Sequence, residues 1–310
     1  RHIDWLETTH SCPRFLIERF AARHGFEGCE ALLEAIDRPA PIALRVTRRG
    51  GEPTAVSQRL RAEGIDTVPS KFLPEALRVR HGAPQRGSAF RAGSFYIQDE
   101  ASQMVARLAA PRDPSASYLD LCSAPGGKLL AVADRIAAAH GPMFAADVSL
   151  ERLRSLGENA RRLDVGGLLR VAMDATRPGL RGTFGTILLD APCSGTGLLR
   201  RHPEIRWRRS ESDITRFALL QERVLLEAVD LLAPGGRLIY AVCSQEPEEG
   251  QERIAALRGA HPTLTLLDAR DSLPPPAASL VGPDGCLRTL PHRDDLDGFF
   301  AAVLQRPPAV

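Results

Sequence analysis

Short apolar segments alternate with longer amphipathic ones between residues 118 and 242, and this alternation constrains the fold more than any other feature of the sequence. The apolar segments cover 118–121, 143–147, 168–172, 186–190 and 237–242, and residues with helical spacing cover 129–139, 150–163 and 214–232. Strands that alternate with helices predict a parallel sheet covered on both faces. We therefore expect a doubly wound α/β domain over 93–310, with a proline-rich loop at 273–277 and a last strand at 298–304.

The first 92 residues lack this alternation. Phe15, Ile17 and Phe20 have helical spacing, whereas 41–46 alternates like a strand. Glycines and basic residues over 81–93 are typical of a boundary. This part of the chain is predicted to be a small α+β domain over 1–92.

The composition limits the class of protein. A chain of 310 residues with 44% hydrophobic residues is long enough to bury the cores of two domains. Neither a bilayer-spanning apolar run nor a secretion signal is seen, so no membrane partner is expected. The six cysteines have neither disulfide-framework nor zinc spacing, which favours reduced thiols, no metal and a cytoplasmic location. Cys12, Cys29 and Cys286 are expected to pack as small apolar residues.

A glycine turn follows the strand predicted at 118–121. Gly126 and Gly127 let the backbone approach a ligand and turn into a helix whose N-terminus favours negative charge. The segment has neither the G-x-G-x-x-G pattern nor the P-loop pattern, which disfavours dinucleotides and triphosphates. An ordinary strand–helix turn is the alternative.

Aspartates follow the next two predicted strands. Asp147 ends one strand, a position from which a carboxylate accepts hydrogen bonds from ribose hydroxyls. Asp174 follows the other, where it could meet an adenine amino group. Each alone is more often a helix cap or turn residue. Together with the glycine turn they outline a nucleoside pocket that suits S-adenosyl-L-methionine.

Two cysteines complete the pattern at the strand ends. The segment Asp190-Ala-Pro-Cys193-Ser-Gly-Thr-Gly197 follows one strand, and Cys243 follows another. An acid and a proline after a strand are typical of the loop with which base-modifying methyltransferases hold their target base. A thiol there implies covalent chemistry, because C5 of a pyrimidine is a poor nucleophile until a group adds to C6. We expect both sulfurs to converge on one pyrimidine ring.

With these motifs in view, the sequence resembles the RsmB/Sun-type (Nop2/Sun family) RNA cytosine-5 methyltransferases from about Arg14 to Arg306. The resemblance rests on the segments 98–102, 120–128, 190–197, 200–207, 243–249 and 297–300. The Arg-Arg-His-Pro-Glu-Ile-Arg-Trp segment at 200–207 is most similar to the bacterial branch that acts on 16S ribosomal RNA.

The family implies a Rossmann-like, S-adenosylmethionine-dependent methyltransferase fold with a mostly parallel seven-stranded sheet, closed by an antiparallel strand near Phe299. It implies that Cys243 attacks C6 of cytosine, that Cys193 assists removal of the C5 proton and release, and that Asp190 bonds the base at N3. In related DNA enzymes the cysteine of the Pro-Cys motif is the nucleophile, so Cys193 is the rival assignment. Lys128 is expected to orient groups in the site.

The resemblance also implies the cofactor-binding residues. We assign this role to Cys122, Ser123, Ala124, Pro125, Gly126, Gly127, Lys128, Asp147, Arg152, Asp174 and Asp190. Two departures from the family pattern stand out. Val242 occupies the position before the nucleophile, where relatives usually have threonine, and the N-terminal helical RNA-binding domain of many bacterial members is not seen.

A basic segment with one aromatic residue follows the Cys193 loop. Such a segment suits phosphate contact and base stacking on single-stranded RNA, although a solvated helix face is the alternative. The predicted RNA-binding residues are Arg200, Arg201, His202, Arg206 and Trp207. The expected partner of this monomer is therefore RNA, which the domain at 1–92 is also predicted to bind, with ribosomal RNA favoured over transfer RNA. A catalytically silent RNA-binding module is the alternative from another class.

Overall fold

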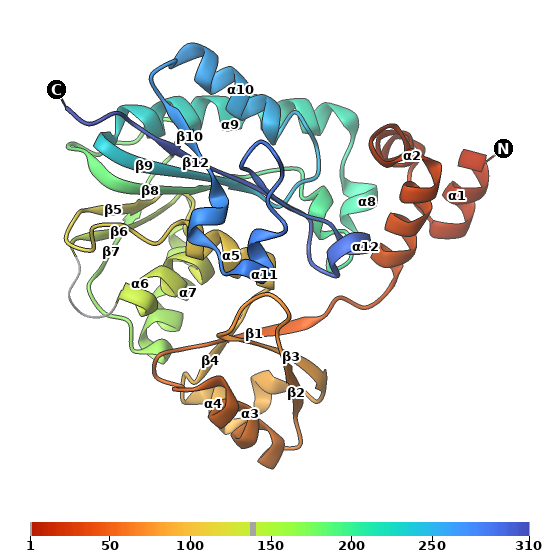
Figure 1. The fold of residues 1–310 in the computed structure, drawn as a ribbon, viewed down its shortest axis with the longest axis horizontal. Helices are drawn as coiled ribbons and strands as arrows, with labels where there is room; N and C mark the ends of the chain where they lie inside the picture. The colour runs from red at the N-terminus through yellow and green to blue at the C-terminus, as the bar shows by residue number, and fades with distance from the viewer. Residues whose placement is uncertain (1, 137–140, 310) are drawn as a thin grey trace.

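The computed structural model describes residues 2–136 and 141–309. Figure 1 shows a large α/β part, a small α/β part below it and a pair of helices to one side. Within the described residues, no helix combines the length and the apolar character that a membrane crossing needs.

The central sheet belongs to the large part. Its strands are β5 (Tyr118–Asp120), β6 (Met143–Asp147), β7 (Leu168–Ala172), β8 (Phe184–Asp190), β9 (Leu232–Val242), β10 (Thr265–Leu267), β11 (Leu287–Thr289) and β12 (Phe299–Gln305). They lie in the order β10-β12-β9-β8-β5-β6-β7, and β11 also pairs with β12. Strands β5 to β9 run parallel to their neighbours, whereas β12 is antiparallel to β9. The predicted doubly wound sheet with a closing antiparallel strand is confirmed.

The described sheet has eight strands where seven were expected. The additional strand is β11, which pairs with the first part of β12, while β10 pairs with the last part of the same edge. Sequence patterning itself marked six strands and missed both β10 and β11, because three residues show too little alternation to mark a strand.

Helices cover both faces of this sheet (Figure 1). One face carries α5 (Glu100–Leu108), α6 (Gly127–Ile136) and α7 (Leu150–Leu163), and the other carries α9 (Glu211–Asp230) and α10 (Gln251–Ala260). In β8, Leu188 packs into the first core cluster, whereas Ile187 and Leu189 pack into the second. A strand buried on both sides explains the continuous apolar run in the sequence.

Element boundaries differ from the predicted ones by a few residues in several places, among them α9, β8 and β12. The helix expected at 129–139 begins two residues earlier, and its predicted last residues, 137–139, lie outside the described part. Strand β9 begins at Leu232, ahead of the predicted start at 237. The proline-rich loop contains a short helix, α11 (Pro275–Ala278), because Pro275 and Pro276 occupy first-turn positions whose N–H groups need no partner.

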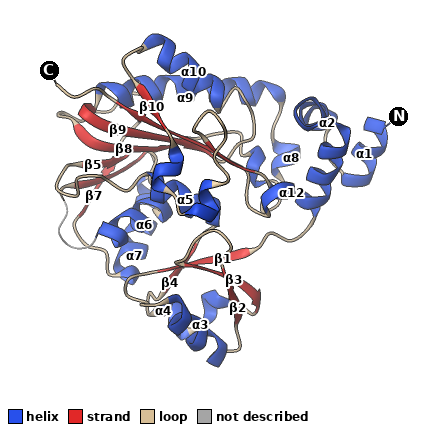
Figure 2. Cartoon of the chain, viewed as in Figure 1, coloured by secondary structure: helices blue, strands red, loops and turns tan. Residues whose placement is uncertain are grey.

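The N-terminal part consists of two packing units (Figure 2). Helices α1 (His2–His10) and α2 (Arg14–Asp37) pack together and against Leu199 and Ile205 of the large part. The second unit is an antiparallel sheet of order β2-β3-β1-β4 with two helices on it. Its elements are β1 (Ile42–Val46), α3 (Pro53–Ala62), β2 (Asp66–Pro69), β3 (Ala76–His81), α4 (Ser88–Arg91) and β4 (Phe95–Ile97). Strand β4 lies beyond the predicted boundary at 92.

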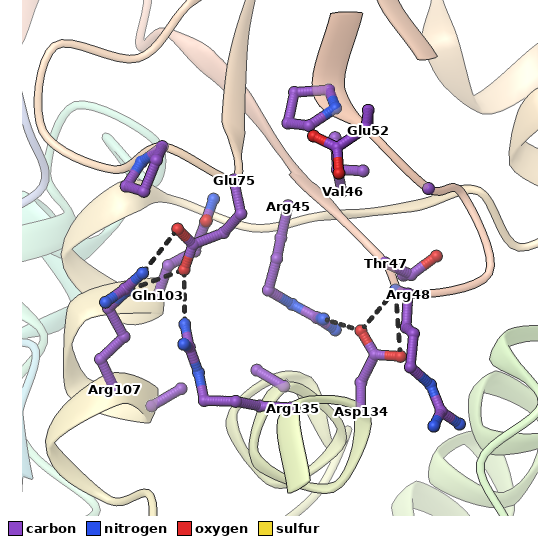
Figure 3. A pocket seen from close by; sticks show the side chains of 15 residues that line it. Arg45, Val46, Thr47, Arg48, Glu52, Glu75, Gln103, Arg107, Asp134 and Arg135 are labelled. Carbon is purple, nitrogen blue, oxygen red and sulfur yellow. Dashed lines mark hydrogen bonds and ion pairs between the residues drawn. The ribbon is translucent and has the colours of Figure 1, made fainter. Parts of the chain in front are cut away.

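Ion pairs hold the small sheet against the large part around a cavity of about 410 Å³. Figure 3 shows Arg45 of β1 directed at Asp134 of α6, with a nitrogen–oxygen distance of 3.1 Å. On the other side Glu75 accepts hydrogen bonds from Arg107 at 2.8 Å and Arg135 at 2.6 Å. The small sheet therefore meets the helix that begins at the glycine turn.

Candidate active site

The structure brings Cys193 and Cys243 together, with 3.3 Å between their sulfur atoms. The parallel pairing of β8 and β9 places Asp190 beside Ala241, so the segments that follow both strands leave the sheet side by side. An amide hydrogen bond from Ala191 to the carbonyl oxygen of Ala241, 2.8 Å long, continues the pairing past the end of β8. Neighbouring parallel strands therefore deliver both thiols to one place.

Hydrogen bonding and burial set the protonation of Cys193. The contact with Cys243 and the burial of the side chain raise the pKa of the Cys193 thiol well above its usual range. Cys193 therefore keeps its proton near neutral pH and can donate it toward the sulfur of Cys243.

Lys128 and Asp190 form a partly buried ion pair beside these sulfurs. The ammonium nitrogen lies 2.6 Å from a carboxylate oxygen and 5.1 Å from the centre of the Phe299 ring. Burial lowers the pKa of Lys128, but the charge and hydrogen bond of Asp190 and the charge of Cys243 outweigh it and raise that pKa overall. A positive charge near a thiol favours its thiolate form.

A cavity of about 400 Å³ opens in front of this group. Four carboxylates line it, against the two cations Lys128 and Arg201. They are Asp99, Asp120, Asp190 and Asp297. Oδ1 of Asp120 and Oδ1 of Asp297 are buried and have no hydrogen-bond partner among the described residues. An acidic cavity with free acceptor atoms suits a ligand with positive charge, such as the ammonium and sulfonium groups of S-adenosyl-L-methionine.

The carboxyl groups of this cavity shift one another's pKa. Burial, and then the nearby charge of Asp190, raise the pKa of Asp120 to about 8. Burial and the charge of Asp99 raise the pKa of Asp297 to about 7, although Arg201 opposes this and bonds both carboxylates, at 2.5 Å and 3.0 Å. The pattern analysis missed Asp99, Asp120 and Asp297 as site residues, although all three lie in the segments that carry the family resemblance.

The predicted cofactor turn has a fixed shape. Residues 122–125, Gly127 and Lys128 line the cavity. Oδ2 of Asp147 accepts a hydrogen bond of 3.0 Å from the amide of Ala124, and Arg152 donates to the carbonyl oxygen of the same residue. Gly126 has a φ of 101°, and a Cβ there would lie 2.7 Å from Leu156, so only glycine fits. Asp147 and Arg152 thus brace the turn from behind and do not line the cavity.

Asp174 lies outside this cavity. Its carboxylate accepts hydrogen bonds of 2.8 Å from the amide and the hydroxyl of Thr176, and these bonds hold the pKa of Asp174 below its usual range. The residue lines a separate hollow, with Thr176 and Arg177 on one side and α9 on the other. Asp147 and Asp174 still follow adjacent strands, because β6 pairs in parallel with β7. Their roles toward ribose and adenine remain predictions.

The acids that follow Cys243 are neutralised within the fold. Glu246 is fully buried and lies 2.6 Å from both Arg19 and Arg23, and Glu248 lies 2.5 Å from Arg19. These arginines come from α2. The negative charge that the sequence places next to Cys243 is therefore compensated by the N-terminal helices.

Three of the five predicted RNA-binding residues form ion pairs with carboxylates of the same molecule. Arg200 pairs with Asp295 at 2.7 Å, Arg201 with Asp297 and Asp99, and Arg206 with Asp37 at 2.6 Å. The other two are open to solvent, with exposed side-chain fractions of 54% for His202 and 66% for Trp207. Sequence alone does not distinguish an internal arginine from a surface one. The exposed pair remains the part of this prediction that the geometry favours.

The side chain of Val242 lies on the opposite face of the sheet from that of Cys243. It is fully buried in the core cluster that faces α9, whereas Cys243 packs against the opposite cluster. The side chain at 242 therefore contributes to packing, and its change from threonine removes no group from the cavity.

The other cysteines are all free thiols, and Cys12, Cys29 and Cys286 are buried as predicted. In the described part of the chain, no three His, Cys, Asp or Glu side chains are grouped as a metal site requires.

Comparison with known proteins identifies relatives of this chain. The family model for "16S rRNA methyltransferase RsmB/F" matches residues 106–305, and that for the ferredoxin-like domain of RsmF/B-like methyltransferases matches residues 12–85. Ribosomal RNA small subunit methyltransferase B of Xylella fastidiosa (strain 9a5c) is 38% identical over 94% of this chain and 68% of its own. A probable enzyme of the same name from Bacillus subtilis (strain 168) is 31% identical over 97% of this chain and 67% of its own. The chain thus spans about two thirds of the length of these relatives.

Solved structures show the same architecture. A methyltransferase homolog protein from Pyrococcus horikoshii matches with a TM-score of 0.80 and 26% identity, over 98% of each chain. NSun6 from the same organism, solved with SFG, matches with a TM-score of 0.84 and 21% identity, over 96% of this chain and 99% of that one. At that identity the second match concerns the fold alone.

Proposed function

The chain belongs to the 16S rRNA methyltransferase RsmB/F family and is an RNA methyltransferase, and from this premise we propose that it methylates carbon 5 of cytosine with Cys243 as the nucleophile. The observation that carries the proposal is the 3.3 Å contact between the sulfurs of Cys193 and Cys243 beside the Lys128–Asp190 pair. Methylation of a ring nitrogen or an exocyclic amine would need neither thiol.

The methyl donor is S-adenosyl-L-methionine, which supplies an electrophilic methyl group when bound. The turn 122–128 and the carboxylates of Asp120 and Asp190 are the groups that would hold its charged end. The unpartnered Oδ1 of Asp120 supports this fit, because a buried acceptor gains most from a charged donor.

The side chains divide the reaction between them. The thiolate of Cys243 attacks C6, and the S–C6 bond makes C5 nucleophilic toward the methyl group. Asp190 accepts a hydrogen bond from N3 of the base when that nitrogen carries a proton, and Lys128 holds that carboxylate and offsets charge on the adduct. Cys193 assists the last step: once it has lost its own proton its sulfur accepts the C5 proton, the C5–H electron pair forms the C5–C6 double bond, and the S–C6 electron pair returns to the Cys243 sulfur.

A cytosine in 16S ribosomal RNA is the substrate that we propose. The names of the curated relatives support it, as does the exposed Trp207 near the Cys193 loop, on which an unstacked base can lie. The target nucleotide would have to leave its stack to reach the cavity. A monomer in the reducing cytoplasm, where both thiols stay reduced, completes the proposal.

Trapping of the covalent adduct tests the assignment of the thiols. Cys193→Ala and Cys243→Ala variants are incubated with 16S ribosomal RNA fragments or transfer RNA and the methyl donor, and protein–RNA bands are sought under denaturing conditions. Cys193→Ala should accumulate the adduct, and Cys243→Ala should never form it. The opposite pattern would exchange the two roles, and absence of adduct and product with every RNA would refute the proposal.

A further inference from the structure

We propose that Glu249 is a positioning residue that sets the distance between the two reactive sulfurs. The inference rests on the proposed function, because it assigns Glu249 a part in the release step of that reaction. Glu249 touches neither sulfur. It acts on the residue that follows each cysteine.

One carboxylate binds both cysteine loops. Oε1 of Glu249 accepts a hydrogen bond of 2.8 Å from the amide of Ser194, and Oε2 accepts from the hydroxyl of the same serine. Oε2 also accepts a hydrogen bond of 2.5 Å from the hydroxyl of Ser244. Ser194 directly follows Cys193 and Ser244 directly follows Cys243, so Glu249 is a common acceptor for both loops.

The surroundings of Glu249 fix the carboxylate in turn. Gln221 of α9 donates to Oε1 at 3.1 Å, and the hydroxyl of Tyr240 donates to the backbone carbonyl of Glu249 at 2.5 Å. The residue is fully buried, and all four donors that the structure gives to its carboxylate are uncharged. A buried carboxylate without a cation is costly, and only a complete set of hydrogen bonds compensates for it. Such a carboxylate holds its donors in one arrangement.

The two loops depend on Glu249 unequally. Cys243 directly follows β9, where Val242 pairs with Phe300 of β12, so the sheet itself fixes its position. Cys193 lies three residues past the end of β8, and the amide next to it bonds to Glu249. Loss of Glu249 should therefore displace Cys193 more than Cys243. The nucleophile would still attack, but the step that Cys193 assists would slow.

Glu249→Gln tests this, because glutamine keeps the size of the side chain but replaces one acceptor oxygen with a donor that opposes those of the serines. The matched control is Glu252→Gln, an exposed glutamate in the first turn of α10. Each variant is assayed for kcat, for the KM of the methyl donor, for thermal unfolding and for the covalent adduct with 16S ribosomal RNA fragments. We expect Glu249→Gln to lower kcat about 100-fold, as an ångström-scale displacement does, with KM near the wild-type value. We also expect it to accumulate the adduct as Cys193→Ala does, and Glu252→Gln to match the wild type.

The adduct separates a positioning role from a general structural one. A wild-type rate in Glu249→Gln, or a lower rate without accumulated adduct, would overturn the inference. Should Glu249→Gln be recovered unfolded, Ser194→Ala decides, because it removes one of the same hydrogen bonds. Accumulation of adduct in Ser194→Ala supports the inference, and release at the wild-type rate overturns it. If Cys193→Ala forms the adduct and the Glu249 variant does not, this inference alone fails, whereas no adduct in Cys193→Ala refutes the proposed function itself.

Discussion

The amide nitrogen of Gly197 donates a hydrogen bond of 3.1 Å to the carbonyl oxygen of Cys243. The carbonyl oxygen of Gly197 accepts another, 2.8 Å long, from the amide of Gly298. The loop that carries Cys193 is therefore fastened by its backbone to the end of β9 and to the start of β12. A Cβ at position 197 would overlap the carbonyl oxygen of Gly298 and lie 3.0 Å from that of Cys243.

Gly197→Ala should therefore displace the loop that carries Cys193 and lower both stability and activity. Because the obstructing atoms belong to the backbone, we expect a loss of about 2–3 kcal/mol in unfolding free energy, measured by urea denaturation, and little methyl transfer. Gly259→Ala is the control, since Gly259 lies in α10 with open space around it. That change should stabilise the protein by about 0.5–1 kcal/mol. Equal stability of the two variants would contradict the close approach described here.

Lys128→Met should leave Asp190 without its cation inside the site. We expect single-turnover methyl transfer to fall at least about 100-fold and unfolding free energy to fall by about 3 kcal/mol, as for other broken buried pairs. Lys71 is the other lysine of the chain and lies exposed beside Phe72. Lys71→Met should change neither quantity. A Lys128→Met enzyme with wild-type turnover would exclude Lys128 from the reaction.

The raised pKa of Asp120 predicts how stability depends on pH. An acid with a pKa of about 8 in the folded state and 3.8 as its ordinary value binds more protons folded than unfolded between those values. Its contribution to stability is then largest at low pH and falls by about 1.4 kcal/mol for each pH unit as the pH rises toward 8. Asp120→Asn cannot ionise, so its unfolding free energy relative to that of the wild type should increase as the pH rises from 5 to 8. Denaturation curves at both pH values measure this, and a constant difference would argue against a protonated Asp120.

Variants at Trp207 and Arg206 should affect different properties, RNA affinity in the first case and folding stability in the second. Trp207→Ala removes an exposed aromatic surface, so we expect RNA affinity to fall about 5- to 100-fold with thermal stability unchanged. Arg206→Ala removes hydrogen bonds to Asp37 and to the carbonyl oxygen of His10, so we expect it to cost about 2 kcal/mol of stability instead. Filter binding and thermal denaturation measure the two effects. Interchanged results would mean that the arginine contacts RNA.

Periodicity predicted the central sheet well, because β5, β6, β8 and most of β9 are buried and show short apolar runs, whereas the edge strand β7 is partly exposed but still mostly apolar in sequence. Predicted and observed bounds agree for β6, β7 and α7. The same pattern placed Asp190 and the two cysteines at strand ends. That they lie next to each other depends on the strand order, in which β9 is the neighbour of β8, and neither periodicity nor spacing determines that order.

The internal ion pairs were not predicted, because their two partners come from distant parts of the chain. Arg19 and Arg23 neutralise Glu246 from more than 220 residues away, and Arg200 and Arg201 bond to Asp295 and Asp297. A count of basic residues does not distinguish these internal ions from a nucleic-acid surface. The separation of α1 and α2 from the small sheet was missed for a similar reason, since Leu199 and Ile205 complete their core.

Helix α6 connects the active site with the contact between the small sheet and the large part. It carries Lys128 in its first turn and Asp134, the partner of Arg45, about 9 Å further along its axis. We therefore expect a tilt of the small sheet to move α6 as a unit and to displace the ammonium group of Lys128 at the active site. For anyone who builds chimaeras from these enzymes, the exchangeable module is the small sheet together with α6, and grafting the sheet alone onto a foreign helix should cost turnover as well as RNA affinity.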